Sequence, residues 1–207
     1  MIKTLIFDLG GVVITLDPDE AMRRFELLGI KDARQQMGVY GQTGIFLQVE
    51  NGSIGADEFC RQLAMQAGLS HCSYEQAQWA WLGFVKEVPQ QRLENLLTLK
   101  KLYNVLLLSN TNPFIMDWAR SEAFSNDRYS IEYYFHRTFC SYELNDYKPS
   151  ASIFRKVLAE MGLKADECVF VDDGMKNVEA SESVGMHGLL VAKDSDWMDD
   201  LQKILEA

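Results

Sequence analysis

The sequence predicts an α/β protein: a doubly wound, Rossmann-like parallel sheet with a helical insert after its first strand. Two observations support this prediction. Short apolar runs alternate with helical periods over most of the chain, and the interval from Asp17 to Pro89 holds helical patterns only. Alternating strands and helices are typical of parallel sheets covered by helices. We therefore expect a core formed by residues 1–16 and 89–207 and a helical unit formed by residues 17–88.

The predicted strands are short runs with little polar alternation, as expected for strands that are buried on both faces. They are "TLIFDL" (4–9), "NVLLLSN" (104–110), "ECVFVDD" (167–173) and "HGLLVA" (187–192), with a weaker candidate in "RTFCSYEL" (137–144).

The predicted helices of the insert begin with Asp17 as N-cap and Pro18 in the first helical position. Further helices are expected over 31–38, 42–50, 55–68 and 73–87, the last opening with the capping-box pattern "SYEQ". In the core, the spacing of apolar residues predicts helices over 150–162, 175–186 and 196–207.

Composition limits the classes of function. The chain has 207 residues and a formal net charge of −10 without a basic stripe, which argues against binding to nucleic acid or to an anionic membrane. The four cysteines form no CxxC pair, so neither a zinc site nor a disulfide framework is expected. No run is apolar enough for a membrane span or a secretory signal. These features predict a soluble cytoplasmic protein.

Polar residues stand where the predicted strands end. The carboxyl ends of parallel strands meet at one edge of a sheet, where ligands bind. This edge is expected to gather three acids, a hydroxyl, an amide and the lysine that precedes a helix: Asp8, Asp172, Asp173, Ser109, Asn110 and Lys148.

These residue types favour phosphoryl chemistry. Three neighbouring carboxylates would repel one another unless a hard cation lay between them, and Mg²⁺ prefers oxygen ligands. The metal and Lys148 would neutralise a phosphoryl group, while Ser109 would donate a hydrogen bond to it. Asp8 would then be a nucleophile that forms an aspartyl-phosphate.

The segments "FDLGGV", "LLSNTN", "KPSASIF" and "VFVDDGMKN", in this order, resemble the four motifs of the haloacid dehalogenase-like hydrolase superfamily. Their combination is most similar to the bacterial sugar-phosphatase branch that includes alpha-glucose-1-phosphatase. The resemblance covers the core, and it implies that the helical insert is a cap over the site that shapes substrate choice.

The resemblance also implies a role for each matching residue. Asp8 is expected to be the nucleophile and a metal ligand, together with the carbonyl of Gly10 and the carboxylate of Asp173. The remaining assignments are Asp172 for metal-bound water, Ser109 and the backbone of Asn110 for the phosphoryl group, Lys148 for the phosphoryl group and Asp8, and Asn177 as a further candidate.

Gly10 departs from most phosphatases of this superfamily, which have an aspartate there as general acid and base. Positioned proton transfer contributes about 10²–10⁴-fold to a rate, so a slow or leaving-group-selective enzyme is expected. The rate is expected to fall least for sugar 1-phosphates and acyl phosphates. The resembling branch also has glycine here. Asp17, at the entry to the insert, is our candidate for a substitute acid.

The leading hypothesis is a Mg²⁺-dependent phosphatase acting on a small phosphorylated metabolite. Two alternatives stay open from the sequence, a metal-independent dehalogenase and a non-catalytic phosphate-binding member of the superfamily. A receiver-type regulatory protein fits less well, because an insert directly after its first strand would be foreign to it. Ser109 and Asn110 have an alternative reading as caps of the next helix. The sequence specifies neither the substrate nor the oligomeric state.

Overall fold

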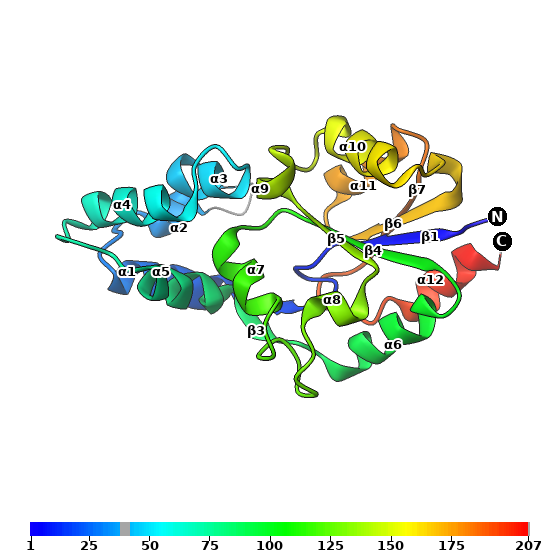
Figure 1. Cartoon of the computed structure of the whole chain (residues 1–207), viewed down its shortest axis with the longest axis horizontal. Helices are drawn as coiled ribbons and strands as arrows, with labels where there is room; N and C mark the ends of the chain where they lie inside the picture. The colour runs from blue at the N-terminus through cyan, green and yellow to red at the C-terminus, as the bar shows by residue number, and fades with distance from the viewer. Residues whose placement is uncertain (38–41, 207) are drawn as a thin grey trace.

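The computed structural model describes residues 1–37 and 42–206, which contain a five-stranded parallel sheet in the order β5-β4-β1-β6-β7 (Figure 1). In this sheet β1 is central and pairs with β4 on one side and β6 on the other. The predicted doubly wound α/β architecture is confirmed. The strands span Thr4–Phe7 (β1), Asn104–Ser109 (β4), Arg137–Cys140 (β5), Cys168–Asp172 (β6) and His187–Leu190 (β7).

Helices cover both faces of the sheet (Figure 1). On one face lie α10 (Ala151–Met161) and α11 (Met175–Glu182), and on the other lie α6 (Gln90–Lys100) and α12 (Met198–Leu205). Successive strand side chains point to opposite faces. Ile6 therefore packs in the cluster that contains Phe154 of α10, whereas Leu5 and Phe7 pack in the cluster that contains Trp197. The three predicted core helices are present as α10, α11 and α12, and residue 207 of the predicted helix 196–207 lies outside the described residues.

The segments between β4 and α10 contain short helices, and they correct one prediction. The predicted strand over 137–144 is too long: β5 ends at Cys140, and residues 141–144 form α9 (Ser141–Leu144). Cys140 pairs with Ser109, the last residue of β4, so the chain beyond it has no strand to pair with. The other short helices are α7 (Pro113–Ala119), α8 (Ile131–Tyr134) and the 3₁₀ turn η2 (Ala165–Glu167).

The helices of the insert lie together at one side of the sheet, at the left of Figure 1. The Asp17 carboxylate accepts a hydrogen bond from the Glu20 N–H at 3.0 Å, and Ser73 and Gln76 form the predicted capping box. The core boundaries 1–16 and 89–207 and the cap boundaries 17–88 stay a prediction. The helices span Pro18–Leu27 (α1), Ala33–Gln36 (α2), Gly44–Glu50 (α3), Ala56–Ala67 (α4) and Tyr74–Trp81 (α5); residue 38 of the predicted helix 31–38 lies outside the described residues.

The predictions that a helix continues to residue 87 and that the insert contains no strand are wrong. Helix α5 ends at Trp81, and after the 3₁₀ turn η1 (Leu82–Phe84) the chain forms β3 (Val85–Glu87). This strand pairs antiparallel with β2 (Thr15–Leu16), and the Asp17 N–H donates to the Phe84 carbonyl at 2.9 Å. The two segments that connect the insert to the core therefore form a short two-stranded ribbon, in which each segment supplies backbone hydrogen-bond partners to the other.

In the part of the chain that the structure describes, no helix combines the length and apolar character that crossing a membrane requires. All four cysteines are buried free thiols.

Candidate active site

The carboxyl ends of two neighbouring strands, β1 and β6, place three acids side by side. Asp8 follows β1, Asp172 is the last residue of β6, and Asp173 comes directly after it. One carboxylate oxygen from each of these three residues lies within 4.8 Å of the others. The structure thus brings together the acids that the sequence predicted for one edge of the sheet.

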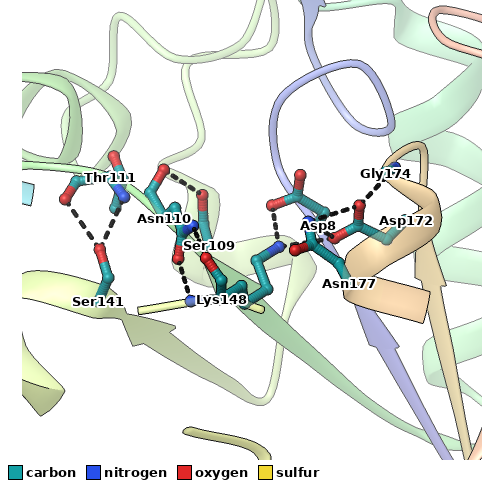
Figure 2. Close-up of polar contacts among 9 residues, drawn as sticks. All are labelled: Asp8, Ser109, Asn110, Thr111, Ser141, Lys148, Asp172, Gly174 and Asn177. Carbon is teal, nitrogen blue, oxygen red and sulfur yellow. Dashed lines mark hydrogen bonds and ion pairs between the residues drawn. The ribbon is translucent and has the colours of Figure 1, made fainter. Parts of the chain in front are cut away.

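Lys148 lies between two of these acids (Figure 2). Its Nζ atom is 2.8 Å from Asp8 Oδ1 and 2.7 Å from Asp172 Oδ2, and the residue is only 2% exposed. Burial lowers the pKa of Lys148, but the charges of Asp172 and Asp8 outweigh this effect and raise that pKa above its usual value. Lys148 is therefore a permanent cation in the centre of the cluster.

Asn110 holds the backbone of Lys148 in place. Its Nδ2 donates to the Lys148 carbonyl at 2.9 Å, and its Oδ1 accepts from the Lys148 N–H at 2.9 Å (Figure 2). The next helix, α7, is capped two residues later by Asn112, whose Oδ1 accepts from the Ile115 N–H. The alternative that Ser109 and Asn110 cap this helix is therefore wrong.

Asp172 is fully buried and has hydrogen bonds to both of its oxygens. Oδ1 accepts from the Gly174 N–H at 2.7 Å and from Asn177 Nδ2 at 3.0 Å, while Oδ2 accepts from Lys148 and, at 3.2 Å, from Asn177 (Figure 2). Asn177 comes from the first turns of α11. The carboxylate of Asp172 is fixed against Lys148, and the metal role predicted for it stays a prediction.

The charges of this cluster fit a divalent cation. Burial raises the pKa of Asp8 to about 7 against the opposing effect of Lys148, and burial together with the charge of Asp172 raises the pKa of Asp173. Three acids thus face one lysine, and a further cation is needed to keep all of them ionised. Carboxylate oxygens at this spacing are the ligands that Mg²⁺ prefers.

The backbone after β1 lies against the same acids. Gly11 has a φ of +77°, and a Cβ atom on it would collide with Oδ2 of Asp173. Only glycine combines this conformation with so close an approach. The second glycine of "FDLGGV" is therefore required for the backbone at residues 10 and 11 to pass beside the Asp173 carboxylate.

A cavity with a volume of about 210 Å³ adjoins this cluster. Its lining combines core and insert: Gly10, Ser109 and Asn110 come from the core, whereas Glu50 and Trp81 come from the insert. Because Ser109 and Asn110 lie at the end of β4, the cavity adjoins the edge of the sheet that carries Asp8. It has the position expected for the part of a ligand that projects from the acids and lysine.

Glu50 is a site residue that the sequence analysis missed. It is the last residue of α3 and is buried, and its carboxyl group accepts from Gln42 Nε2 at 2.8 Å and from the Tyr147 hydroxyl at 3.4 Å. Burial raises its pKa to about 8, and the charge of Asp8 acts in the same direction. The available signal was an acid placed four residues after Phe46 on the apolar face of a helix.

Asp17 was the sequence-based candidate for a substitute acid. Its carboxylate caps α1, and it does not belong to the lining of the cavity among the described residues. The catalytic role suggested for Asp17 stays a prediction, and the structure brings Glu50 rather than Asp17 to the cavity.

Comparison with known proteins identifies relatives along the whole chain. The family model for haloacid dehalogenase-like hydrolases matches residues 2–185. A D-ribitol-5-phosphate phosphatase of Bacteroides thetaiotaomicron is 39% identical over 207 residues, which is 100% of both chains.

Solved structures show the same similarity. An HAD-like family hydrolase from Porphyromonas gingivalis superposes with a TM-score of 0.94 at 32% identity, covering 100% of this chain and 99% of that one. An HAD family enzyme of Bacteroides thetaiotaomicron, in complex with magnesium and inorganic phosphate, has a TM-score of 0.87 at 33% identity, covering 96% and 98%.

Proposed function

Because this chain belongs to the haloacid dehalogenase-like hydrolase family, we propose that it is a Mg²⁺-dependent phosphatase acting through an aspartyl-phosphate on Asp8. The observation that carries the proposal is the cluster of Asp8, Asp172 and Asp173 around the buried Lys148, beside a cavity. The similarity to an enzyme solved with magnesium and inorganic phosphate supports it.

We assign the metal site to the carboxylates of Asp8 and Asp173 and the carbonyl of Gly10, with Asp172 beside them. Bound Mg²⁺ supplies positive charge that offsets the acids and the phosphoryl oxygens. Lys148 supplies a second positive charge and holds the Asp8 carboxylate at 2.8 Å. These two charges allow a dianionic phosphate to approach an anionic nucleophile.

In the proposed reaction, an oxygen of Asp8 attacks the phosphorus atom and the bond from phosphorus to the leaving group breaks. Ser109, the backbone N–H of Asn110 and Lys148 hold the phosphoryl oxygens. Water then attacks the aspartyl-phosphate, which releases inorganic phosphate and restores Asp8. The residues that hold the phosphoryl group are fixed beforehand, since Asn110 and Lys148 bind each other through two hydrogen bonds.

We further infer that the leaving group is an uncharged polyhydroxylated molecule, a sugar or a sugar alcohol. Two buried polar atoms of residues lining the cavity have no hydrogen-bonding partner among the described residues: Gln42 Oε1 and Trp81 Nε1. Hydroxyl groups can satisfy both donors and acceptors of this kind. The name of the 39% identical relative, a D-ribitol-5-phosphate phosphatase, points to the same class.

The test is release of inorganic phosphate from p-nitrophenyl phosphate and from a panel of sugar and sugar alcohol phosphates. We expect wild-type activity with Mg²⁺, none with EDTA and none for Asp8→Asn. Activity that survives EDTA or Asp8→Asn would overturn the proposal. Halide release from a 2-haloacid would favour the dehalogenase alternative, and phosphate binding without turnover would favour the non-catalytic one.

A further inference from the structure

The proposed substrates need a proton donor for the leaving group, and the segment after β1 does not provide one. The alkoxide of a sugar alcohol 5-phosphate is a poor leaving group, and its expulsion requires a proton donor. Residue 10, two positions after Asp8, is glycine and has no side chain that could donate a proton. The donor must therefore come from another residue that reaches the leaving group.

Among the described residues that line the cavity, Glu50 is the only one with a carboxyl group. It shares this cavity with Gly10, Ser109 and Asn110, so it faces the space that the leaving group would occupy. Its side chain is held by Gln42 at 2.8 Å and by the Tyr147 hydroxyl at 3.4 Å. Its backbone carbonyl accepts from the Ser141 hydroxyl, which also accepts from the Thr111 N–H directly after Asn110.

We propose that Glu50 is the proton donor to the leaving-group oxygen, in place of the acid that is absent at Gly10. This inference rests on the proposed phosphatase function. As Asp8 forms its bond to phosphorus and the bond to the leaving group breaks, the Glu50 proton passes to the departing oxygen. The product alcohol leaves, and the Glu50 carboxylate then accepts a proton from the water that attacks the aspartyl-phosphate. Each turnover returns Glu50 to its protonated form.

The surroundings of Glu50 suit this role. Its pKa of about 8 keeps the carboxyl group protonated at neutral pH. Among the described residues, the titratable groups that act on it are Tyr147, whose own pKa is raised by burial, and Asp8 at the end of β1. Gln42 and Asn112, on its other sides, are uncharged. No described basic side chain acts on Glu50 to hold it ionised.

The neighbourhood of Gly10 offers a way to test the substitution. A Cβ atom on Gly10 would lie 2.9 Å from Leu16 Cδ1, the end of a flexible side chain that also lines the cavity. Gly10 is not among the described residues with positive φ. An aspartate can therefore be accommodated there by movement of Leu16, and it would occupy the same cavity as Glu50.

The experiment compares kcat/KM for a sugar alcohol 5-phosphate and for p-nitrophenyl phosphate, whose leaving group needs no proton. We expect Glu50→Gln to lower the first by about 100-fold and the second by less than about 5-fold, because acid catalysis assists only the poor leaving group. Wild-type kcat/KM for the alkyl phosphate should fall above about pH 8, and Glu50→Gln should lose this fall. The matched control is Glu26→Gln, on the exposed face of α1.

Rescue by a second substitution separates a chemical role from a structural one. We expect Gly10→Asp, added to Glu50→Gln, to raise kcat/KM for the sugar alcohol 5-phosphate at least tenfold over that of Glu50→Gln alone. Three results would overturn the role of Glu50 while leaving the proposed phosphatase function intact. Glu50→Gln could lower kcat/KM equally for both substrates, or it could keep the fall in kcat/KM above pH 8. Asp17→Asn, rather than Glu50→Gln, could lose that fall. A wild type without Mg²⁺-dependent activity on either substrate would overturn the proposed function and this inference together.

Discussion

Lys148 is a buried cation whose position depends on two carboxylates, Asp8 and Asp172. Removing one partner of a buried ion pair leaves uncompensated charge and costs about 3–5 kcal/mol. We expect Lys148→Met to abolish turnover and to lower the free energy of unfolding at pH 7 by about 3 kcal/mol, as measured by urea denaturation.

The matched control is Lys156→Met, which removes a lysine paired with Asp146 at 3.0 Å. The Lys156 side chain is 45% exposed, so its loss should cost less than about 1 kcal/mol. A Lys148→Met protein as stable as the control would contradict the assignment of Lys148 as the charge that balances the acids.

Glu50 should also affect stability as a function of pH. Its pKa in the folded protein is about 8, above the usual glutamate value of 4.5. The folded state therefore holds a proton that the unfolded state releases, and wild-type stability falls as the pH rises from 4.5 to 8. Glu50→Gln keeps an acceptor for Gln42 but cannot ionise.

We therefore expect Glu50→Gln to gain stability relative to wild type between pH 5 and pH 9, with the difference levelling off above about pH 8. Thermal unfolding across this range measures it. A constant difference between the two proteins at every pH would show that Glu50 does not titrate with a raised pKa.

At the scale of elements, the ribbon of β2 and β3 joins the insert to the core, and Gly83 lies where it meets α1. A Cβ atom on Gly83 would lie 2.6 Å from Ala21 Cα, which is backbone and cannot move aside alone. Gly83→Ala should lower the free energy of unfolding by about 1–3 kcal/mol, the usual cost of overpacking.

Gly55→Ala is the comparison for this substitution, since Gly55 has no heavy atom within 4 Å of an added Cβ. Its effect should stay within about 1 kcal/mol. Chemical denaturation of both variants decides the matter: equal stabilities would mean that α1 does not pack directly on residue 83.

The sequence predicted elements whose signals are local. The strands of the core are apolar runs, and the first helix of the insert begins with a cap that can be recognised from Asp17 and Pro18 alone. The errors concern residues whose structure depends on a distant partner. Residues 85–87 become a strand because residues 15 and 16 lie beside them, and β5 ends where β4 ends.

The same distinction holds for the candidate site. Asp8, Ser109, Asp172 and Asp173 were predicted to meet because the ends of parallel strands share one edge of a sheet. Glu50 was not predicted, since its position depends on how the insert packs against the core, and helix α3 lies far from β1 and β4 in sequence. Sequence spacing carries no information about that packing.

At the scale of the whole molecule, the cavity joins two kinds of residue. The core supplies the acids, the lysine and the residues proposed to hold the phosphoryl group, whereas Gln42, Glu50 and Trp81 of the insert line the cavity beside them. In this account phosphoryl transfer depends on the core alone, and the choice and protonation of the leaving group depend on the insert. Variants of the two groups should therefore differ in their dependence on the leaving group.

In the proposed reaction, Asp8 carries the phosphoryl group. The most direct measurement is peptide mass spectrometry of the enzyme quenched in acid during turnover of a sugar alcohol phosphate with Mg²⁺. We expect one added phosphoryl group on the peptide that contains Asp8, and we expect this group to be absent in Asp8→Asn and in the presence of EDTA. Steady release of phosphate by Asp8→Asn, or a phosphoryl group found on another residue, would contradict it.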